Sequence, residues 1–291
     1  MRKDSREMRS MTSTPTFLGL GGARCGSTWL HTLLSKHPDV LMPKKRKEID
    51  FFNKNWERSF EWYLNCFKYD TASGVPIAIG DVSPGYSLNE KCAYRVAQCK
   101  TVSKFIYIVR NPVNRLVSHY HHHLQVTNEK KSIDDFVKYN RFIAIDNGLY
   151  AQNLKRYLQY FSLNQLLILV FEEAFRDIVT TTHRIAHFLE IDPAKFYQIP
   201  GKIGEAGIPR HGKALAWFHK RAHFLRKYDL DWLISLGHRI KLREFFTGTS
   251  SKISITQEQR NNIFLEYVDD IREFETLTGF DLSNWKQEFE R

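Results

Sequence analysis

The fold is decided by a stretch in which an apolar run breaks into glycines and then enters an amphipathic helix: Thr16-Phe17-Leu18-Gly19-Leu20-Gly21-Gly22-Ala23-Arg24-Cys25-Gly26-Ser27-Thr28-Trp29-Leu30. Glycines let the backbone turn sharply and approach a ligand closely. The helix that follows presents unpaired N–H groups and the positive end of its dipole to an anion. This stretch therefore predicts a loop that binds phosphate.

The position of the cation in this loop argues against an ordinary ATP or GTP hydrolase. Gly21 and Gly26 have the spacing of a P-loop, but the position that should hold lysine is occupied by Ser27. A cation is found instead at Arg24, inside the loop.

A second motif follows about eighty residues later, at Ile106-Tyr107-Ile108-Val109-Arg110-Asn111-Pro112-Val113-Asn114-Arg115-Leu116-Val117-Ser118-His119-Tyr120. A β-branched and aromatic run ends at Arg110, and Pro112 stands where a helix can begin. The pattern predicts a second strand that leads into a helix, with a cation at the junction.

Together the two motifs resemble those of the sulfotransferases that use 3′-phosphoadenosine 5′-phosphosulfate as the sulfuryl donor. Arg24-Cys25-Gly26-Ser27-Thr28-Trp29 resembles the 5′-phosphosulfate loop of that family, which implies that these six residues bind the donor. The second motif resembles the family's 3′-phosphate motif, which implies that Arg110 and Ser118 hold the 3′-phosphate. Similarity to the family extends over about residues 16–215.

The coarse secondary-structure pattern alternates strands and helices. We expect strands at residues 17–20, 77–80, 105–109 and 166–171, and helices at 28–35, 89–97, 112–124, 150–161 and 176–189. Continuous apolar strands suit a parallel sheet covered on both faces, with ligands at the carboxyl ends of the strands. The predicted fold is a single α/β domain with a central parallel sheet flanked by helices and a P-loop-like phosphosulfate-binding loop.

The length and composition favour one large domain. We expect it to span residues 15–291 of this 291-residue chain, after a disordered polar tail at 1–14. No stretch has the apolar core of a signal peptide or the length of a membrane span. The cysteines, Cys25, Cys66, Cys92 and Cys99, are too few for a disulfide framework, so we expect a cytoplasmic location.

The charge balance favours anionic ligands. The net charge is +11, from 43 Lys and Arg against 32 Asp and Glu. The nucleotide donor accounts for part of this excess. We expect no nucleic-acid partner, because no helix-turn-helix, RRM, KH or zinc-knuckle pattern is present.

The proposed chemistry needs a cation at the leaving phosphate. Arg24 and the N–H groups of Gly26, Ser27 and Thr28 are placed to stabilise the 5′-phosphate as it leaves, so Arg24 is a catalytic candidate. The family more often has lysine at this position. Arginine carries the same positive charge, but on a planar guanidinium group.

A carboxylate after the loop is the candidate base. The element Lys47-Glu48-Ile49-Asp50-Phe51-Phe52 resembles the Glu-x-x-Phe-Phe element of the glycosaminoglycan N- and 3-O-sulfotransferases, which implies that Glu48 is the general base. Adjacent phenylalanines can raise the pKa of a carboxyl by limiting its hydration. The alternative is a solvated glutamate in a charged run, with Phe51 and Phe52 in the core.

The end of another predicted strand, Asp81-Val82-Ser83-Pro84-Gly85-Tyr86, resembles a Glu-Lys-Ser/Thr-Pro-x-Tyr element of the same relatives. Val82 replaces the lysine, which leaves open how the site supplies positive charge there. Asp81 and Ser83 remain candidates for contact with the acceptor. Alternatively, Asp81 ends a Walker-B-like strand and holds Mg²⁺, which would make the protein a P-loop kinase that uses ATP.

Histidines cluster after Ser118. His119 and His123 are one helical turn apart, but no Cys or carboxylate is suitably spaced to complete a zinc site, so we expect no metal. His122 is a candidate for contact with the acceptor.

A basic loop and helix follow the region of clearest resemblance. The segment that contains Arg210 and Lys213 resembles the basic loop, late in the sequence, with which sulfotransferases close over the nucleotide. Both residues are candidates for a second contact with the 3′-phosphate. Residues 210–246 form a candidate basic helical lid. Packing on the core and attachment to an anionic membrane surface are alternatives for this helix.

The sequence as a whole predicts a metal-independent sulfotransferase that acts on a hydroxyl or amine of a small metabolite, a natural product or a carbohydrate. The alternatives are the P-loop kinase and a non-catalytic module that binds nucleotides or anions. Neither the acceptor nor the oligomeric state follows from the sequence.

Overall fold

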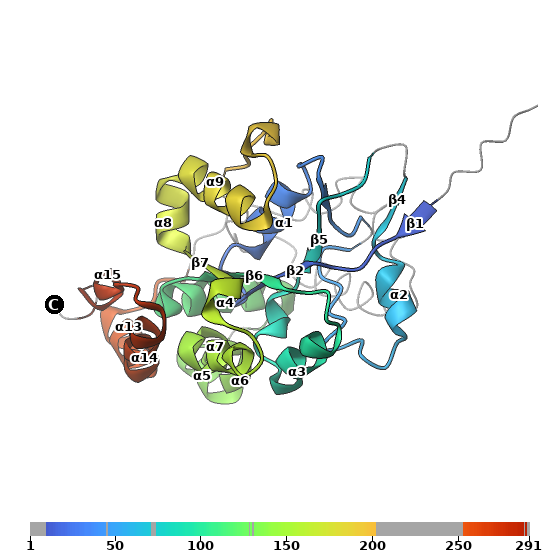
Figure 1. The fold of residues 1–291 in the computed structure, drawn as a ribbon. Coiled ribbons are helices and arrows are strands. Elements are labelled where there is room, and N and C mark those ends of the chain that lie inside the picture. Colours follow the sequence, from blue (N-terminus) through green and yellow to red (C-terminus); the bar gives the residue numbers. More distant parts are fainter. Residues whose placement is uncertain are drawn as a thin grey trace, which may run out of the picture.

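A five-stranded parallel sheet lies at the centre of the molecule (Figure 1). The computed structural model describes residues 10–44, 46–70, 74–127, 129, 131–201, 253–287 and 289. The strand order is β3-β5-β2-β6-β7, and every neighbouring pair is parallel. The strands are β2 (Phe17–Gly21), β3 (Val40–Leu41), β5 (Ala78–Val82), β6 (Lys104–Val109) and β7 (Leu166–Val170).

The four strands predicted from apolar runs are confirmed, each within two residues at either end. All residues of β2 and β5 are buried, as expected for strands covered on both faces. The edge strand β3 was not predicted, because two residues are too short to show a period.

Helices cover both faces of the sheet. On one side lie α1 (Ser27–Leu34), α8 (Phe171–Arg176) and α9 (Ile178–Leu189). On the other side lie α3 (Glu90–Gln98), α4 (Pro112–Thr127) and α7 (Tyr150–Leu158) (Figure 1). This arrangement confirms the predicted α/β class.

A short helix that was not predicted precedes one that was. The helix expected at residues 176–189 is confirmed as α9, within two residues at its start, whereas α8, which ends at Arg176, was not expected. The side chain of Asp177 accepts a hydrogen bond from the N–H of Thr180, at 3.0 Å. Such an N-cap satisfies an N–H that the first turn cannot pair internally, and it starts the second helix.

Shorter elements complete the described fold. They are α2 (Phe60–Leu64), α5 (Ile133–Tyr139), α6 (Arg141–Ala144), α13 (Gln257–Leu265), α14 (Val268–Thr278) and α15 (Ser283–Gln287). Strand β1 (Ser10–Thr12) pairs antiparallel with β4 (Lys68–Asp70). Residues 10–12 are therefore ordered by strand pairing, whereas the sequence analysis placed them in a disordered tail.

The C-terminal helix α14 holds the start of α7 through hydrogen bonds. The carboxylate of Asp270, on α14, accepts hydrogen bonds from the N–H groups of Ala151 and Gln152, at 3.0 and 2.9 Å. Burial raises the pKa of Asp270. This contact fixes the end of α7 that carries Tyr150, whose hydroxyl accepts a hydrogen bond from the N–H of Arg110.

The parallel sheet brings five chain segments to one edge. Since the carboxyl ends of parallel strands meet there, the segments after β2, β3, β5, β6 and β7 leave the sheet close together. Among the described helices, none combines the length and the apolar character needed to cross a membrane. The proposed lid at 210–246 lies outside the described residues.

Candidate active site

The glycine loop after β2 adopts the conformation that its glycines predict. Gly21 and Gly26 have φ values of 133° and 103°, in the left-handed region that favours glycine. A Cβ at Gly21 would lie 2.3 Å from the carbonyl oxygen of Ile108. The N–H of Ala23 donates to Oδ1 of Asn147, at 2.9 Å, so a residue far along the chain holds the loop. Gly26 is the N-cap of α1, and the first N–H groups of that helix have no partner within it.

A cavity of about 520 Å³ opens beside this loop, at the carboxyl edge of the sheet. Its walls carry four cations, Arg24, Lys47, Lys54 and Arg110, and two carboxylates, Glu48 and Asp50. Gly26, Ser27, Thr28, Ser118 and His122 also line it. The excess of positive charge suits an anionic ligand.

Arg110 is held firmly at the end of β6. Its backbone N–H donates to the hydroxyl of Tyr150, at 3.3 Å, and its Nη1 donates to the carbonyl oxygen of Arg24, at 3.0 Å. Its Nε is buried, has no hydrogen-bond acceptor among the described residues, and lies 4.0 Å from Oε1 of Glu172. A buried guanidinium nitrogen without an acceptor is costly unless a ligand supplies one.

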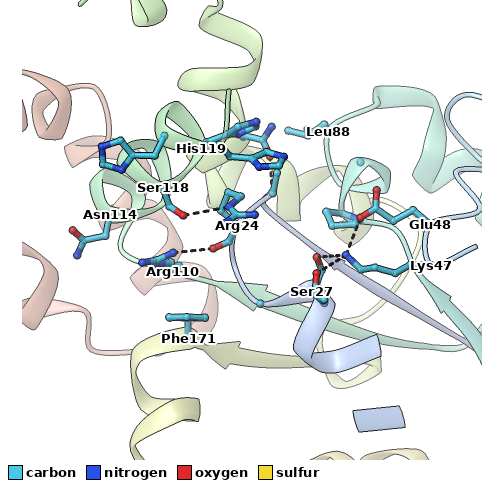
Figure 2. Close-up of a pocket in the computed structure, with 18 of the residues that line it drawn as sticks. Arg24, Ser27, Lys47, Glu48, Leu88, Arg110, Asn114, Ser118, His119 and Phe171 are labelled. Atoms are coloured by element: carbon cyan, nitrogen blue, oxygen red, sulfur yellow. Dashed lines mark hydrogen bonds and ion pairs between the residues drawn. The ribbon is translucent and has the colours of Figure 1, made fainter. Parts of the chain in front are cut away.

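The structure brings the two sequence motifs together. Nε of Arg24 donates to Oγ of Ser118, at 3.2 Å, across 94 residues of sequence (Figure 2). Arg24 thus reaches toward the serine of the second motif, which the resemblance assigned to the 3′-phosphate.

A lysine that the sequence analysis did not assign approaches the other side of the loop. Nζ of Lys47 donates to Oγ of Ser27 and to Oγ1 of Thr28, each at 3.0 Å (Figure 2). It also lies 2.9 Å from Oε1 of Glu48. Because position 27 holds serine, the loop needs a cation from another part of the chain. The charged run around Lys47 does not indicate which of its residues reaches the loop.

The candidate base Glu48 lines the cavity, and its side chain is 41% exposed. Phe51 and Phe52 do not shield it, because both are buried in an aromatic cluster where Phe51 stacks on Tyr63 at 4.5 Å. The phenylalanines belong to the core, as the alternative interpretation held. Glu48 itself is at the cavity, as the resemblance implied.

Asp81 and Ser83 lie behind the cavity wall. Asp81 is fully buried and accepts hydrogen bonds from three hydroxyl groups, those of Tyr63, Ser83 and Tyr86, at 2.8, 2.8 and 3.2 Å. Burial is the main cause that raises the pKa of Asp81, to about 7. Neither Asp81 nor Ser83 lines the cavity.

The same buried group supports the segment that carries Glu48. Ser83 Oγ accepts from the N–H of Asp50 at 3.3 Å, and the Tyr86 hydroxyl accepts from the N–H of Phe51 at 2.9 Å. Asp81 therefore positions this segment through two of the hydroxyl groups that it binds.

The histidines after Ser118 have separate surroundings. Burial, and then the charge of Arg115, lower the pKa of His119 to about 2, so this imidazole is neutral. His121 contacts the carbonyl oxygen of Ile253 at 3.1 Å, and His123 contacts Glu129 at 3.3 Å. Of the candidate acceptor residues, His122 lines the cavity.

Two residues of the predicted donor loop turn their side chains into the core. Cys25 is buried, with its Sγ 3.4 Å from the hydroxyl of Tyr150, and burial raises the pKa of its thiol. Trp29 is buried against Phe175, and its Nε1 donates to the carbonyl oxygen of Pro200 at 2.9 Å. Their side chains are therefore not available to a ligand, and the N–H of Cys25 donates to the carbonyl oxygen of Gly22, at 3.2 Å. Arg210 and Lys213 lie outside the described residues.

Comparison with known proteins identifies what this arrangement is similar to. Residues 15–199 match the model of the family described as "Sulfotransferase domain". The mouse protein "Bifunctional heparan sulfate N-deacetylase/N-sulfotransferase 4" is 28% identical over 213 residues, covering 65% of this chain and 24% of its own length. The mouse protein "Heparan sulfate glucosamine 3-O-sulfotransferase 5" is 25% identical over 192 residues, covering 62% of this chain and 54% of its own length.

A solved structure, that of a sulfotransferase from Alicyclobacillus acidocaldarius, has the same fold. It superposes with a TM-score of 0.67 at 22% identity, covering 94% of this chain and 99% of that chain. The curated relatives above are longer than the region they share with this chain, which spans about a quarter of one and about half of the other.

Proposed function

The chain belongs to the sulfotransferase domain family, and from this premise we propose that it transfers a sulfuryl group from 3′-phosphoadenosine 5′-phosphosulfate to a hydroxyl or amine of an acceptor. One observation carries the proposal. The glycine loop and the Arg110–Ser118 motif, far apart in sequence, meet at one cation-rich cavity and are joined there by Arg24.

The residues at this cavity fit a donor that carries one phosphate at the 3′ position and another at the 5′ position of its ribose. When bound, the donor supplies the sulfuryl group and, on departure, a phosphate leaving group. Arg110, with its buried Nε lacking an acceptor, and Ser118 are suited to the 3′-phosphate. The N–H groups of Gly26, Ser27 and Thr28, at the start of α1, are suited to the 5′ end, because an anion is stabilised by the first turn of a helix.

Glu48 is the proposed general base. Its carboxylate lines the cavity on the same side as Ser27, where the acceptor must approach the donor's 5′ end. A carboxylate within hydrogen-bond reach of the acceptor takes its proton as the nucleophile attacks. His119 is poorly suited to the same task, because its low pKa makes it a weak base.

We propose a small molecule or a carbohydrate as the acceptor. The names of the two mouse relatives, which refer to heparan sulfate, support the carbohydrate class. The four cysteines, Cys25, Cys66, Cys92 and Cys99, are free thiols, which supports a reducing compartment such as the cytoplasm.

The kinase alternative fits the site less well. A P-loop kinase needs a carboxylate that reaches Mg²⁺ beside the phosphates, but Asp81 lies behind the cavity wall with three hydroxyl groups bound to it. The non-catalytic alternative is separated from the proposal by whether transfer occurs at all.

A transfer assay tests the proposal directly. The purified protein is incubated with radiolabelled donor, excess EDTA and a panel of hydroxyl- and amine-bearing acceptors, in parallel with radiolabelled ATP and Mg²⁺. We expect labelled product only from the sulfuryl donor, with EDTA present. Phosphate transfer from ATP would establish the kinase, and tight nucleotide binding without transfer to any acceptor would favour the non-catalytic module.

A further inference from the structure

The cavity has two ends that are served by different cations. At one end, Arg24 donates to Ser118, and Arg110 donates to the carbonyl oxygen of Arg24 (Figure 2). At the other end, Lys47 approaches the two hydroxyl groups at the start of α1. The sequence analysis had assigned Arg24 to the leaving 5′-phosphate, whereas its side chain lies at the end assigned to the 3′-phosphate.

Lys47 is brought to its place by tertiary contacts. It precedes a segment whose backbone is held by Ser83 and Tyr86, and both of those residues donate to the buried Asp81. The side chain of Lys47 is 28% exposed, so it is partly removed from water. Charges interact more strongly in such a setting than on an open surface.

The ammonium group of Lys47 lies at the start of α1. An ammonium group has three donors, and here they face Ser27, Thr28 and Glu48. The neighbouring His31 is neutral, because burial and then the charge of Lys47 lower its pKa to about 4. Directly beside Ser27 and Thr28, the positive charge therefore comes from Lys47 and from the start of the helix.

We propose that Lys47 is a catalytic residue that contacts the 5′-phosphosulfate group, and that Arg24 serves the 3′-phosphate end. This inference rests on the proposed sulfuryl transfer. Glu48 takes the acceptor's proton while the acceptor's oxygen or nitrogen bonds to sulfur. Lys47 and the loop N–H groups stabilise the electron pair that stays on the 5′-phosphate oxygen as the bond from that oxygen to sulfur breaks. Lys47 thereby supplies the charge that a lysine at position 27 or 82 would have supplied.

The affinities for three nucleotides distinguish the roles of the two ends of the cavity. Calorimetry compares adenosine 3′,5′-bisphosphate, adenosine 5′-phosphate and adenosine 3′-phosphate for Lys47→Met and Arg24→Met. We expect Lys47→Met to weaken the first two ligands at least tenfold and the third less than twofold, because charged hydrogen bonds of this kind are worth about 1.5–3 kcal/mol. Arg24→Met should instead weaken the bisphosphate and the 3′-phosphate.

Lys104→Met is the matched control. Lys104 is as exposed as Lys47, at 26%, and forms a similar ion pair with Glu190, at 2.8 Å. It stands at the amino end of β6, opposite the cavity, so its loss should change all three affinities less than twofold. If Lys47→Met weakens all three nucleotides equally or none of them, the inference is wrong. If the unaltered protein binds none of them, the proposed function fails first.

Single-turnover kinetics tests the catalytic part. With donor saturating, Lys47→Met should lower the transfer rate about a hundredfold, and Lys47→Arg should recover part of it, because the leaving phosphate gains charge in the transition state. Unchanged melting temperatures for both variants would show that they are folded. A normal single-turnover rate in Lys47→Met would overturn the catalytic role.

Discussion

The guanidinium group of Arg110 lies over the ring of Phe171, with 4.6 Å between its Cζ and the ring centroid. Arg110 follows β6 directly and Phe171 follows the neighbouring β7, so the sheet itself sets this contact. The ring supports one face of the guanidinium group, which helps to hold Arg110 beside the cavity.

Arg110→Ala should therefore distinguish two nucleotides. We expect the variant to bind adenosine 3′,5′-bisphosphate at least tenfold more weakly and adenosine 5′-phosphate almost normally, because the second ligand lacks the 3′-phosphate. Calorimetry measures both. Arg272→Ala, an exposed change on α14, serves as the control, and equal losses for the two ligands would remove Arg110 from the 3′-phosphate.

Glu48→Gln should abolish most of the transfer without loss of donor binding. Glutamine keeps the shape of the side chain but cannot take a proton, and a positioned base typically contributes about 10²–10⁴ in rate. Turnover at saturating donor and the affinity for adenosine 3′,5′-bisphosphate are measured together. Glu61→Gln, exposed on α2, is the control. A decrease of less than about fivefold, with chemistry rate-limiting, would show that Glu48 is not the base.

Asp81→Asn should change how stability depends on pH. The pKa of Asp81 is raised from 3.8 to about 7, so the folded protein binds this proton more tightly than the unfolded chain does. The resulting stabilisation is complete below about pH 4 and is lost as the pH rises through about 7. The free energy of unfolding in urea, measured for the unaltered protein and for Asp81→Asn at about pH 5 and about pH 8, reports this stabilisation.

We expect the unaltered protein to lose stability relative to Asp81→Asn between these two pH values, by on the order of a few kcal/mol. A difference between the two proteins that stays constant with pH would show that Asp81 does not titrate in this range. Transfer activity should also fall in Asp81→Asn, since Asp81 supports the segment that carries Glu48.

Gly26→Ala should disturb both the loop and the Arg110 end of the cavity. An alanine at a φ of 103° is strained, at a cost on the order of 1–3 kcal/mol, and its Cβ would lie 3.2 Å from the ring of Phe171. We expect a lower melting temperature and weaker binding of adenosine 3′,5′-bisphosphate. Gly201→Ala is the control, because no atom of the residues that the structure describes lies within 4 Å of a Cβ added there. Normal binding by a folded Gly26→Ala would contradict the proposed role of the loop.

The sequence was sufficient for the features that depend on neighbouring residues. Apolar runs predicted the four longer strands of the sheet, and the glycine spacing predicted the loop between β2 and α1. The parallel α/β class followed from the alternation of strands and helices. Because parallel strands end at one edge, the same pattern also predicted that the loop and Arg110 would lie near one another.

The tertiary structure decided which side chains reach which end of the cavity. Arg24 turns toward Ser118, 94 residues away, and Lys47 reaches Ser27 across 20 residues. Asp81 is bound away from the cavity by the hydroxyl group of Tyr63, on α2, together with those of Ser83 and Tyr86 from its own segment. No local pattern encodes these contacts, because the direction of a long charged side chain depends on partners that only the folded chain brings within hydrogen-bond distance.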